Sequence, residues 1–218
     1  MTRTGARMTE ETTEIRQERI GAWRQYDPES ALSPLLKSAL DRFVTLGYHG
    51  TTVRMIADGA GMTVPGLYYH YESKQALLVE LLKMSSQEIR QRTNAAVTEA
   101  GDDPRDRFAA AVQSIVLYMT HRQQLAHLAR EIRGLEEPYR SQHIELRDAL
   151  KASVLTEVIS GKALGRFTVD NPHEATRAVL VMCEGVAEWY RPGGINVPEE
   201  VADRYVGFAL SIVGAVRT

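Results

Sequence analysis

The 218-residue sequence lacks three features: a set of cysteines, a long apolar run and a large net charge. Cys183 is the only cysteine, which excludes a disulfide framework and a cysteine-based zinc site. The longest apolar runs, such as residues 178–183, are far too short to cross a bilayer, and no secretory signal pattern follows Met1. We therefore expect a cytoplasmic protein without a membrane partner.

The charge balance limits the kinds of nucleic-acid binding that are possible. The formal net charge is -2, whereas proteins that coat DNA without sequence preference are usually strongly basic. Any DNA binding by this chain must therefore depend on local positive charge and on one small module that reads bases.

Motifs typical of enzymes are also missing. The sequence has no GxSxG, no GxxxxGK[ST] and no GxGxxG that opens a helix after a strand. His121 and His127 lie six positions apart, do not share a helix face well and have no carboxylate cluster beside them. We expect no catalytic residues, no cofactor and no metal site.

What is present is a series of amphipathic segments separated by proline and glycine, which indicates an all-α fold of about nine helices. Residues 1–30 are polar and are expected to form a flexible N-terminal arm. Ser33 and Pro34 begin a helix whose inner face carries Leu36, Ala39, Leu40, Phe43 and Val44, and Gly47 ends it. Further helices are expected at about residues 52–60, 64–70, 73–98, 105–120, 122–135, 138–160, 172–190 and 198–215.

The segment from Thr51 to Lys74 contains the spacing of a DNA-binding helix-turn-helix. Ala57 is small where two helices cross, Gly61 tolerates the positive φ of the turn, and Leu67 returns from the second helix onto the first. The second helix then exposes a side without acidic residues, suited to bases and phosphates. The candidate DNA-binding residues are Thr52, Arg54, Thr63, Val64, Pro65, Gly66, Tyr68, Tyr69, His70 and Lys74.

This segment resembles the N-terminal domain of the tetracycline-repressor family of bacterial regulators. The resemblance is carried by Phe43, Gly47, Thr52-Val53, Ile56-Ala57, Ala60-Gly61, Thr63, Leu67-Tyr68, Tyr71, Ser73-Lys74 and Leu77-Leu78. Two positions depart from the family pattern. Met55 stands where an acidic or polar residue is common, and Gly66 where a hydroxyl or alanine is usual, so the contribution of Gly66 to DNA binding is open.

The resemblance implies a homodimer that binds a double-stranded, near-palindromic operator with two recognition helices roughly 34–36 Å apart. The last two helices would pack against their symmetry mates, and the alternative is that they close only the core of one subunit. The apolar residues of these helices that are available for burial are Val179, Val186, Tyr205, Phe208, Ala209, Ile212 and Val213. The domains implied are residues 31–78 for DNA binding and residues 79–218 for effector binding and dimerisation.

The resemblance also implies that the middle helices enclose a small-molecule effector, whose binding releases the DNA. The candidate lining is Leu117, Tyr118, His121, Leu125, Leu128, Arg130, Arg133, Tyr139, His143, Leu146, Met182, Val186 and Trp189. The alternative is that most of these residues are simply core. The charged stretch 122–147 has two interpretations: a solvated helix face, or a basic mouth for an acyl-CoA formed by Arg122, Arg130, Arg133 and Arg140. Charged segments of this kind resemble those of actinobacterial regulators of lipid and acyl-CoA metabolism, which supports the second interpretation.

The sequence thus predicts a transcriptional regulator, most simply a repressor that an effector releases from its operator. The alternative is a helical adaptor that has kept this fold without binding DNA.

Overall fold

The computed structural model describes residues 21–27, 32–129 and 135–216. Its elements are η1 (Ala22–Arg24), α2 (Pro34–Gly50), α3 (Val53–Gly59), α4 (Val64–His70), α5 (Lys74–Glu99), α6 (Pro104–His121), α7 (Gln123–Leu128), α8 (Tyr139–Ala163), α9 (Pro172–Glu184), α10 (Val186–Trp189) and α11 (Pro198–Ile212). Within these ranges there is one isolated antiparallel bridge, between Phe167 and Ala215, and no strand. The all-α prediction is confirmed.

Side-chain caps explain why several helices begin where the sequence predicts. The hydroxyls of Ser33, Thr52, Thr63 and Ser73 each accept a hydrogen bond from a backbone N–H in the first turn of the following helix. Proline occupies the first turn of α2, α4, α6, α9 and α11, where its missing N–H costs nothing.

Helix ends agree less well with the prediction. The helix expected at 122–135 ends at Leu128 as α7, and the segment expected to be one helix at 172–190 is divided at Gly185 into α9 and α10. In contrast, α8 continues through Gly161 to Ala163, beyond the expected end at about residue 160. The ring of Phe167 packs where a Cβ of Gly161 would lie, so this glycine permits close packing instead of ending the helix.

The buried side chains form two clusters. One lies in α2, α3, α4 and the first turns of α5, and is completed by Leu125, Leu128 and Leu135 from later in the chain. The other surrounds α6, which packs against α5, α8, α9 and α11. Of the predicted inner face of α2, Leu36, Ala39, Leu40 and Phe43 are buried, whereas Val44 is 38% exposed.

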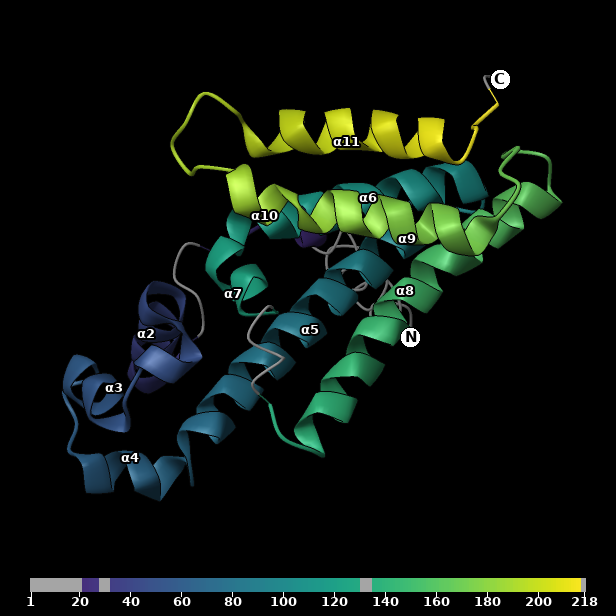
Figure 1. Ribbon diagram of the computed structural model, residues 1–218. Coiled ribbons are helices and arrows are strands. Elements are labelled where there is room, and N and C mark those ends of the chain that lie inside the picture. Colours follow the sequence, from purple (N-terminus) through teal and green to yellow (C-terminus); the bar gives the residue numbers. More distant parts are fainter. Residues whose placement is uncertain (1–20, 28–31, 130–134, 217–218) are drawn as a thin grey trace, which may run out of the picture.

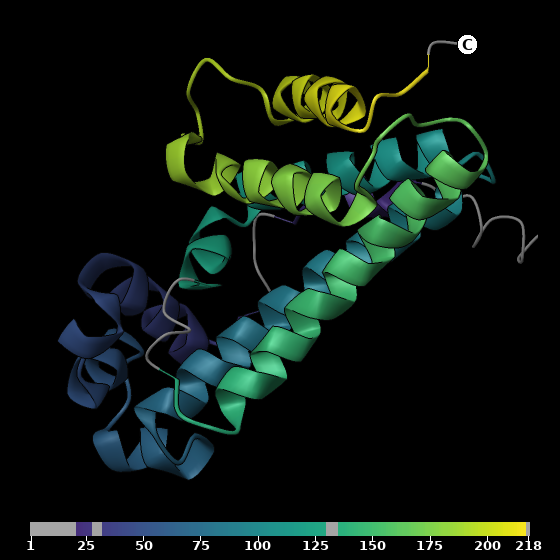
Figure 2. The same ribbon diagram turned by 45° about the vertical axis from the view of Figure 1, so that its right-hand side comes forward.

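Figures 1 and 2 show how these clusters are arranged. Helices α2, α3 and α4 form a head at one end of the molecule. The long helices α5 and α8 run side by side away from it, and α9 and α11 lie together on the outer side of the body. None of the described helices has a stretch long and apolar enough to span a membrane.

The prediction of a flexible arm over residues 1–30 is wrong for its described part. Residues 21–27 are packed on the body, and Trp23 is only 3% exposed within the cluster around α6. Burial of this large indole offsets the entropy cost of ordering the segment. The remainder of the predicted arm lies outside the described residues.

Candidate DNA-binding face and effector cavities

The helix-turn-helix is held together by side chains on its buried side. Ile56, Ala57 and Leu67 are completely buried, so α3 and α4 cross closely against α2 and α5. Gly61 has φ +67° in the turn, where a side chain would be strained. The N–H of Met62 donates to the carbonyl of Ala57 at 2.9 Å and closes the turn. The predicted Ala–Gly–Leu frame is thus the packing frame of the head.

The outer side of α4 is open to solvent. Tyr69 is 87% exposed and Tyr68 is 50% exposed, although both are large aromatic side chains that burial would favour. The remaining candidates on α3, α4 and their caps are exposed or partly exposed: Thr52, Arg54, Thr63, Val64, Pro65, Gly66 and His70. The helix Val64–His70 contains no acidic residue, so its surface does not repel phosphate.

Lys74 has an additional structural role that the sequence did not indicate. Its Nζ donates to the carbonyls of Tyr48 and Thr51, both at 2.7 Å, and lies 4.3 Å from the centre of the Tyr48 ring. Partial burial lowers the pKa of this ammonium below its ordinary value. Lys74 therefore connects the first turn of α5 to the segment that joins α2 and α3.

Two cavities lie along the body between α5 and α8. The first, of about 300 Å³, is bordered mainly by α5 and the first turns of α8, including Val79, Tyr139 and Leu146. The second, of about 340 Å³, extends from α5 and α8 to α6, α9 and α10, and its wall includes Tyr118. His143 borders both.

The cavity walls also contain residues that the sequence analysis missed. On α5 these are Leu82, Ser85, Ser86 and Ile89, which follow the spacing of one helix face and so carried a readable signal. Leu150 and Leu180, from α8 and α9, carried no local signal because only the tertiary packing brings them to the cavity.

Other predicted lining residues lie outside these two cavities, although His121 and Leu125 border a third one beside α2. Leu117 and Val186 are in the core around α6, and Leu125 and Leu128 complete the core of the head because α7 is short and packs against α2. His121 stacks on Tyr26, Met182 packs on the core around α6, and Trp189 is 41% exposed with its Nε1 donating to the Tyr205 hydroxyl. Arg130 and Arg133 lie outside the described residues.

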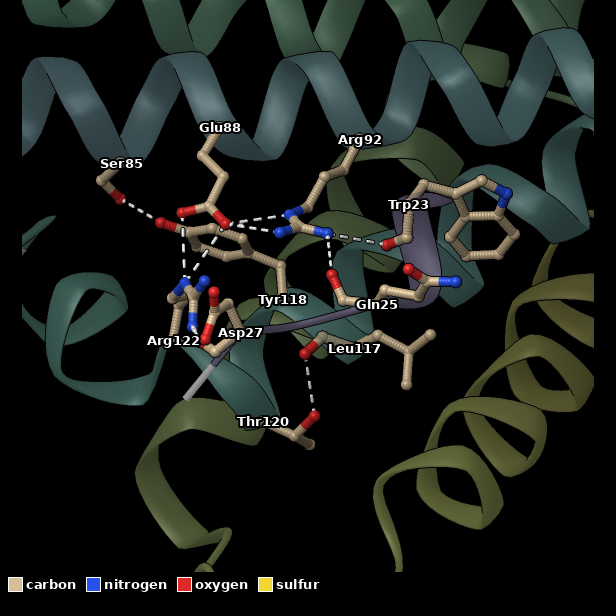
Figure 3. Close-up of polar contacts among 10 residues, drawn as sticks. All are labelled: Trp23, Gln25, Asp27, Ser85, Glu88, Arg92, Leu117, Tyr118, Thr120 and Arg122. Atoms are coloured by element: carbon tan, nitrogen blue, oxygen red, sulfur yellow. Dashed lines mark hydrogen bonds and ion pairs between the residues drawn. The ribbon is translucent and has the colours of Figure 1, made fainter. Parts of the chain in front are cut away.

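Arg122, expected at a basic mouth, instead takes part in an internal ionic cluster (Figure 3). Its Nε donates to both oxygens of Glu88 at 3.2 Å, and its Nη1 donates to the carbonyl of Asp27. Glu88 also pairs with Arg92, whose Nη1 donates to the carbonyls of Trp23 and Gln25. This cluster therefore holds the backbone of residues 21–27, which we call the strap.

A second carboxylate fixes the beginning of the strap. Glu99 accepts hydrogen bonds from the N–H of Gly21 at 2.8 Å, from Trp23 Nε1 at 3.1 Å and from Arg24 Nη1 at 2.9 Å. Burial opposes ionisation of Glu99, but these hydrogen bonds and the charge of Arg24 outweigh it and hold its pKa below the ordinary value. The strap is thus attached to α5 through the carboxylate of Glu99 and the guanidinium of Arg92, which Glu88 holds in place.

The outer faces of α9 and α11 expose three large apolar side chains among charged and polar ones. Val181 on α9 is 62% exposed, and Phe208 and Ile212 on α11 are 55% and 39% exposed. Val179, Val186, Ala209 and Val213, which the sequence offered for the same interface, are buried within this subunit. Each helix thus buries one side in the body and exposes apolar side chains among charged ones on the other.

Comparison with known proteins gives two family matches that cover most of the chain. The model described as "Bacterial regulatory proteins, tetR family" matches residues 35–81. The model described as "Tetracyclin repressor-like, C-terminal domain" matches residues 101–213, which is more than half of the chain.

Individual relatives agree with these matches. The HTH-type transcriptional repressor KstR2 of Mycobacterium tuberculosis is 29% identical over 182 residues, which cover 81% of this chain and 89% of the relative. The structure of the ketosteroid transcriptional regulator KstR2 from the same organism has a TM-score of 0.78 at 23% identity and covers 89% of this chain and 100% of that chain. AibR in complex with isovaleryl coenzyme A and operator DNA has a TM-score of 0.74 at 20% identity, covering 84% and 97%. The two structural matches show the same fold.

Proposed function

From the premise that this chain belongs to the tetracycline-repressor family of bacterial regulatory proteins, we propose that it is a dimeric repressor released from a palindromic operator by a small-molecule effector. In this proposal residues 31–78 bind DNA and residues 79–218 bind the effector and form the dimer. The observation that carries it is the exposed outer side of α4, with Tyr69 87% exposed while Leu67 on the opposite side is completely buried.

The proposed DNA contacts divide into two groups. Thr63, Val64, Pro65, Gly66 and Tyr69 face bases in the major groove, where short side chains let the helix approach closely. Thr52, Arg54, Tyr68, His70 and Lys74 contact the phosphate backbone around it.

The test is a mobility-shift and footprinting experiment on the DNA upstream of the protein's own gene, at several salt concentrations. A repressor gives a sequence-selective, salt-dependent shift, and an adaptor gives none. Tyr69→Ala should lower discrimination between operator and unrelated DNA more than it lowers non-specific affinity. Tyr68→Ala, the matched variant at a proposed backbone contact, should weaken both equally, and the same equal loss for Tyr69 would contradict its role in reading bases.

The exposed apolar side chains of Val181, Phe208 and Ile212 support a homodimer through α9 and α11, because apolar side chains on a surface often mark a protein–protein interface. Phe208→Arg should shift the protein to monomers in sedimentation equilibrium. Val44→Arg, an equally non-conservative change at an exposed residue of α2, should leave the dimer intact. A Phe208→Arg protein that remains dimeric would remove this interface from the proposal.

For the effector we propose a lipid-like, mainly apolar metabolite, and acyl-CoA esters are the first class to test. The apolar cavities along α5 and α8 support this, as does the isovaleryl coenzyme A in the AibR complex. A stabilising effector should raise the melting temperature and release the DNA. If short-chain and long-chain acyl-CoAs all leave the melting temperature unchanged, acyl-CoA esters are excluded as effectors.

A further inference from the structure

His143 is a buried polar side chain without a partner. It lies on α8 and is 6% exposed, and neither of its ring nitrogens has a hydrogen-bond partner among the described residues. Buried polar groups in folded proteins almost always have such partners, and an unpaired one destabilises the structure that contains it. An imidazole in this situation requires an explanation other than stability.

The position of His143 suggests what the missing partner is. Its side chain borders both cavities, and Leu82 is the other residue common to the two walls. A turn of the imidazole therefore presents a ring nitrogen to an occupant of either cavity. The nearby Tyr118 hydroxyl, by comparison, is already paired with Ser85 at 2.8 Å.

The chemistry of the walls limits the occupant. Val79, Leu82, Ile89, Ile115 and Leu150 make the interiors apolar. The charged residues at the borders do not select an anion: Arg147 pairs with Glu184 at 3.7 Å, and Lys83 shares the first cavity with Glu145. An uncharged chain therefore fits these interiors.

We propose that His143 hydrogen-bonds a carbonyl or hydroxyl oxygen near the middle of an elongated, otherwise apolar ligand whose two ends occupy the two cavities. This inference deepens the effector part of the proposed function and rests on it. The same chemistry is offered by a free ketone or alcohol and by the acyl portion of a thioester.

The protonation state of the ring fits this role. Burial, together with the positive charge of Arg147, lowers the pKa of His143 to about 4. At neutral pH the imidazole therefore carries one N–H donor and one free acceptor nitrogen, and can bind an uncharged oxygen without bringing a charge into an apolar cavity.

The test compares two isomeric probes of equal hydrophobicity: the symmetrical eleven-carbon ketone, with its carbonyl at the centre, and the isomer with its carbonyl next to one end. Calorimetric titration of the full-length protein should give about tenfold tighter binding of the symmetrical ketone, as expected for one additional hydrogen bond. Equal binding of the two isomers, or binding of neither, overturns the proposal.

Three variants assign the difference to His143. His143→Leu should abolish the preference and, by removing an unpaired polar group, should give a ligand-free melting temperature at or above that of the wild type. His143→Gln retains a donor and an acceptor and should retain the preference. His173→Leu, the same change at an exposed position of α9, should behave as wild type. A preference that persists in His143→Leu overturns the proposal, and the isomer comparison in wild type and His143→Gln remains decisive if the leucine variant does not fold.

Titration with decanoyl-CoA tests whether the oxygen bound by His143 can be the carbonyl of a thioester as well as that of a free ketone or alcohol. Binding that His143→Leu weakens about tenfold supports the same contact with a thioester carbonyl. Tight binding that is indifferent to His143→Leu overturns the contact for the physiological ligand class. None of these measurements uses DNA, so failure of the ketone comparison and failure of operator binding are observed separately.

Discussion

Lys74→Met tests the most specific contact of the DNA-binding head. The substitution removes the ammonium but keeps the apolar stem, so the two carbonyls of Tyr48 and Thr51 each lose a charged donor at 2.7 Å. Hydrogen bonds from charged donors contribute about 1.5–3 kcal/mol each, and the contact with the Tyr48 ring about 0.5–1 kcal/mol. Release of a partly buried charge offsets much of this, which leaves an expected loss of about 2 kcal/mol in the free energy of unfolding.

For a chain of this length, 1 kcal/mol shifts the melting temperature by about 2–4 °C, so the variant should melt about 4–8 °C below the wild type. The assay is urea and thermal unfolding followed by circular dichroism. Lys83→Met, at an exposed position on the same helix, should change the melting temperature little. An unchanged stability for Lys74→Met would refute the reasoning, because the two hydrogen bonds would then contribute nothing in solution.

The same variant separates the structural role of Lys74 from its proposed role on DNA. An ammonium has three donors, and two are used within the head, which leaves one for a phosphate. If that third donor contacts DNA, affinity should fall alike for all sequences and the salt dependence should decrease by about one charge. A lower stability with an unchanged salt dependence would assign Lys74 to the head alone.

Three further changes test other parts of the molecule. Gly66→Ala should stabilise α4 by up to about 1 kcal/mol in urea unfolding, because alanine favours the helix more than glycine does. The added Cβ would lie 3.2 Å from Thr63 Oγ1, a close contact that a small shift of the threonine relieves. A loss of stability would show that the threonine cannot shift. Glu99→Gln removes the charge that anchors the strap and should cost about 1 kcal/mol. Glu174→Gln, at an exposed position of α9 where the carboxylate pairs only with Arg177 on the surface, should cost no more than about 0.5 kcal/mol. Because burial lowers the pKa of His143 from 6.5 to about 4, the folded protein binds fewer protons than the unfolded chain between these values, so stability should fall as pH falls through this window. Between pH 7 and 4.5, the free energy of unfolding in urea should fall by on the order of 1–2 kcal/mol more for the wild type than for His143→Leu, a value that allows for solvent screening. Equal losses in the two proteins would contradict the lowered pKa of His143.

The head could be predicted from the sequence because its determinants are local. Ala57, Gly61 and Leu67 lie within eleven positions of one another, and caps such as Ser33 and Ser73 act on the residues that follow them. Each element therefore carried its own signal, and the contacts between elements followed from the spacing.

The strap could not be predicted, and the walls of the two cavities along α5 and α8 only in part, because both features depend on contacts between distant positions. The described wall residues that the sequence analysis named are Tyr118, Tyr139, His143 and Leu146. Arg24 and Glu99 are 75 positions apart, and the cavity walls combine α5 with α8 and α9. A periodic pattern shows which side of a helix is apolar but not what covers it. For this reason Leu125 and Leu128 were assigned to an effector pocket although they complete the core of the head.

These long-range contacts determine how the head is attached to the body. Besides the continuous helix α5, α7 places Leu125 and Leu128 in the core of the head, while its first residue, Gln123, donates to the carbonyls of Ala187 and Tyr190 at the end of α10. Ala187 also borders the second cavity, as do Ser85 and Tyr118, which lie next to the ionic cluster that holds the strap. The head is therefore attached to the body by α7 as well as by α5. If the head moved as a rigid unit with α5 alone, the contacts of α7 would break. Any change in the orientation of the head must therefore alter the packing of α7, whose Ala126 borders the second cavity.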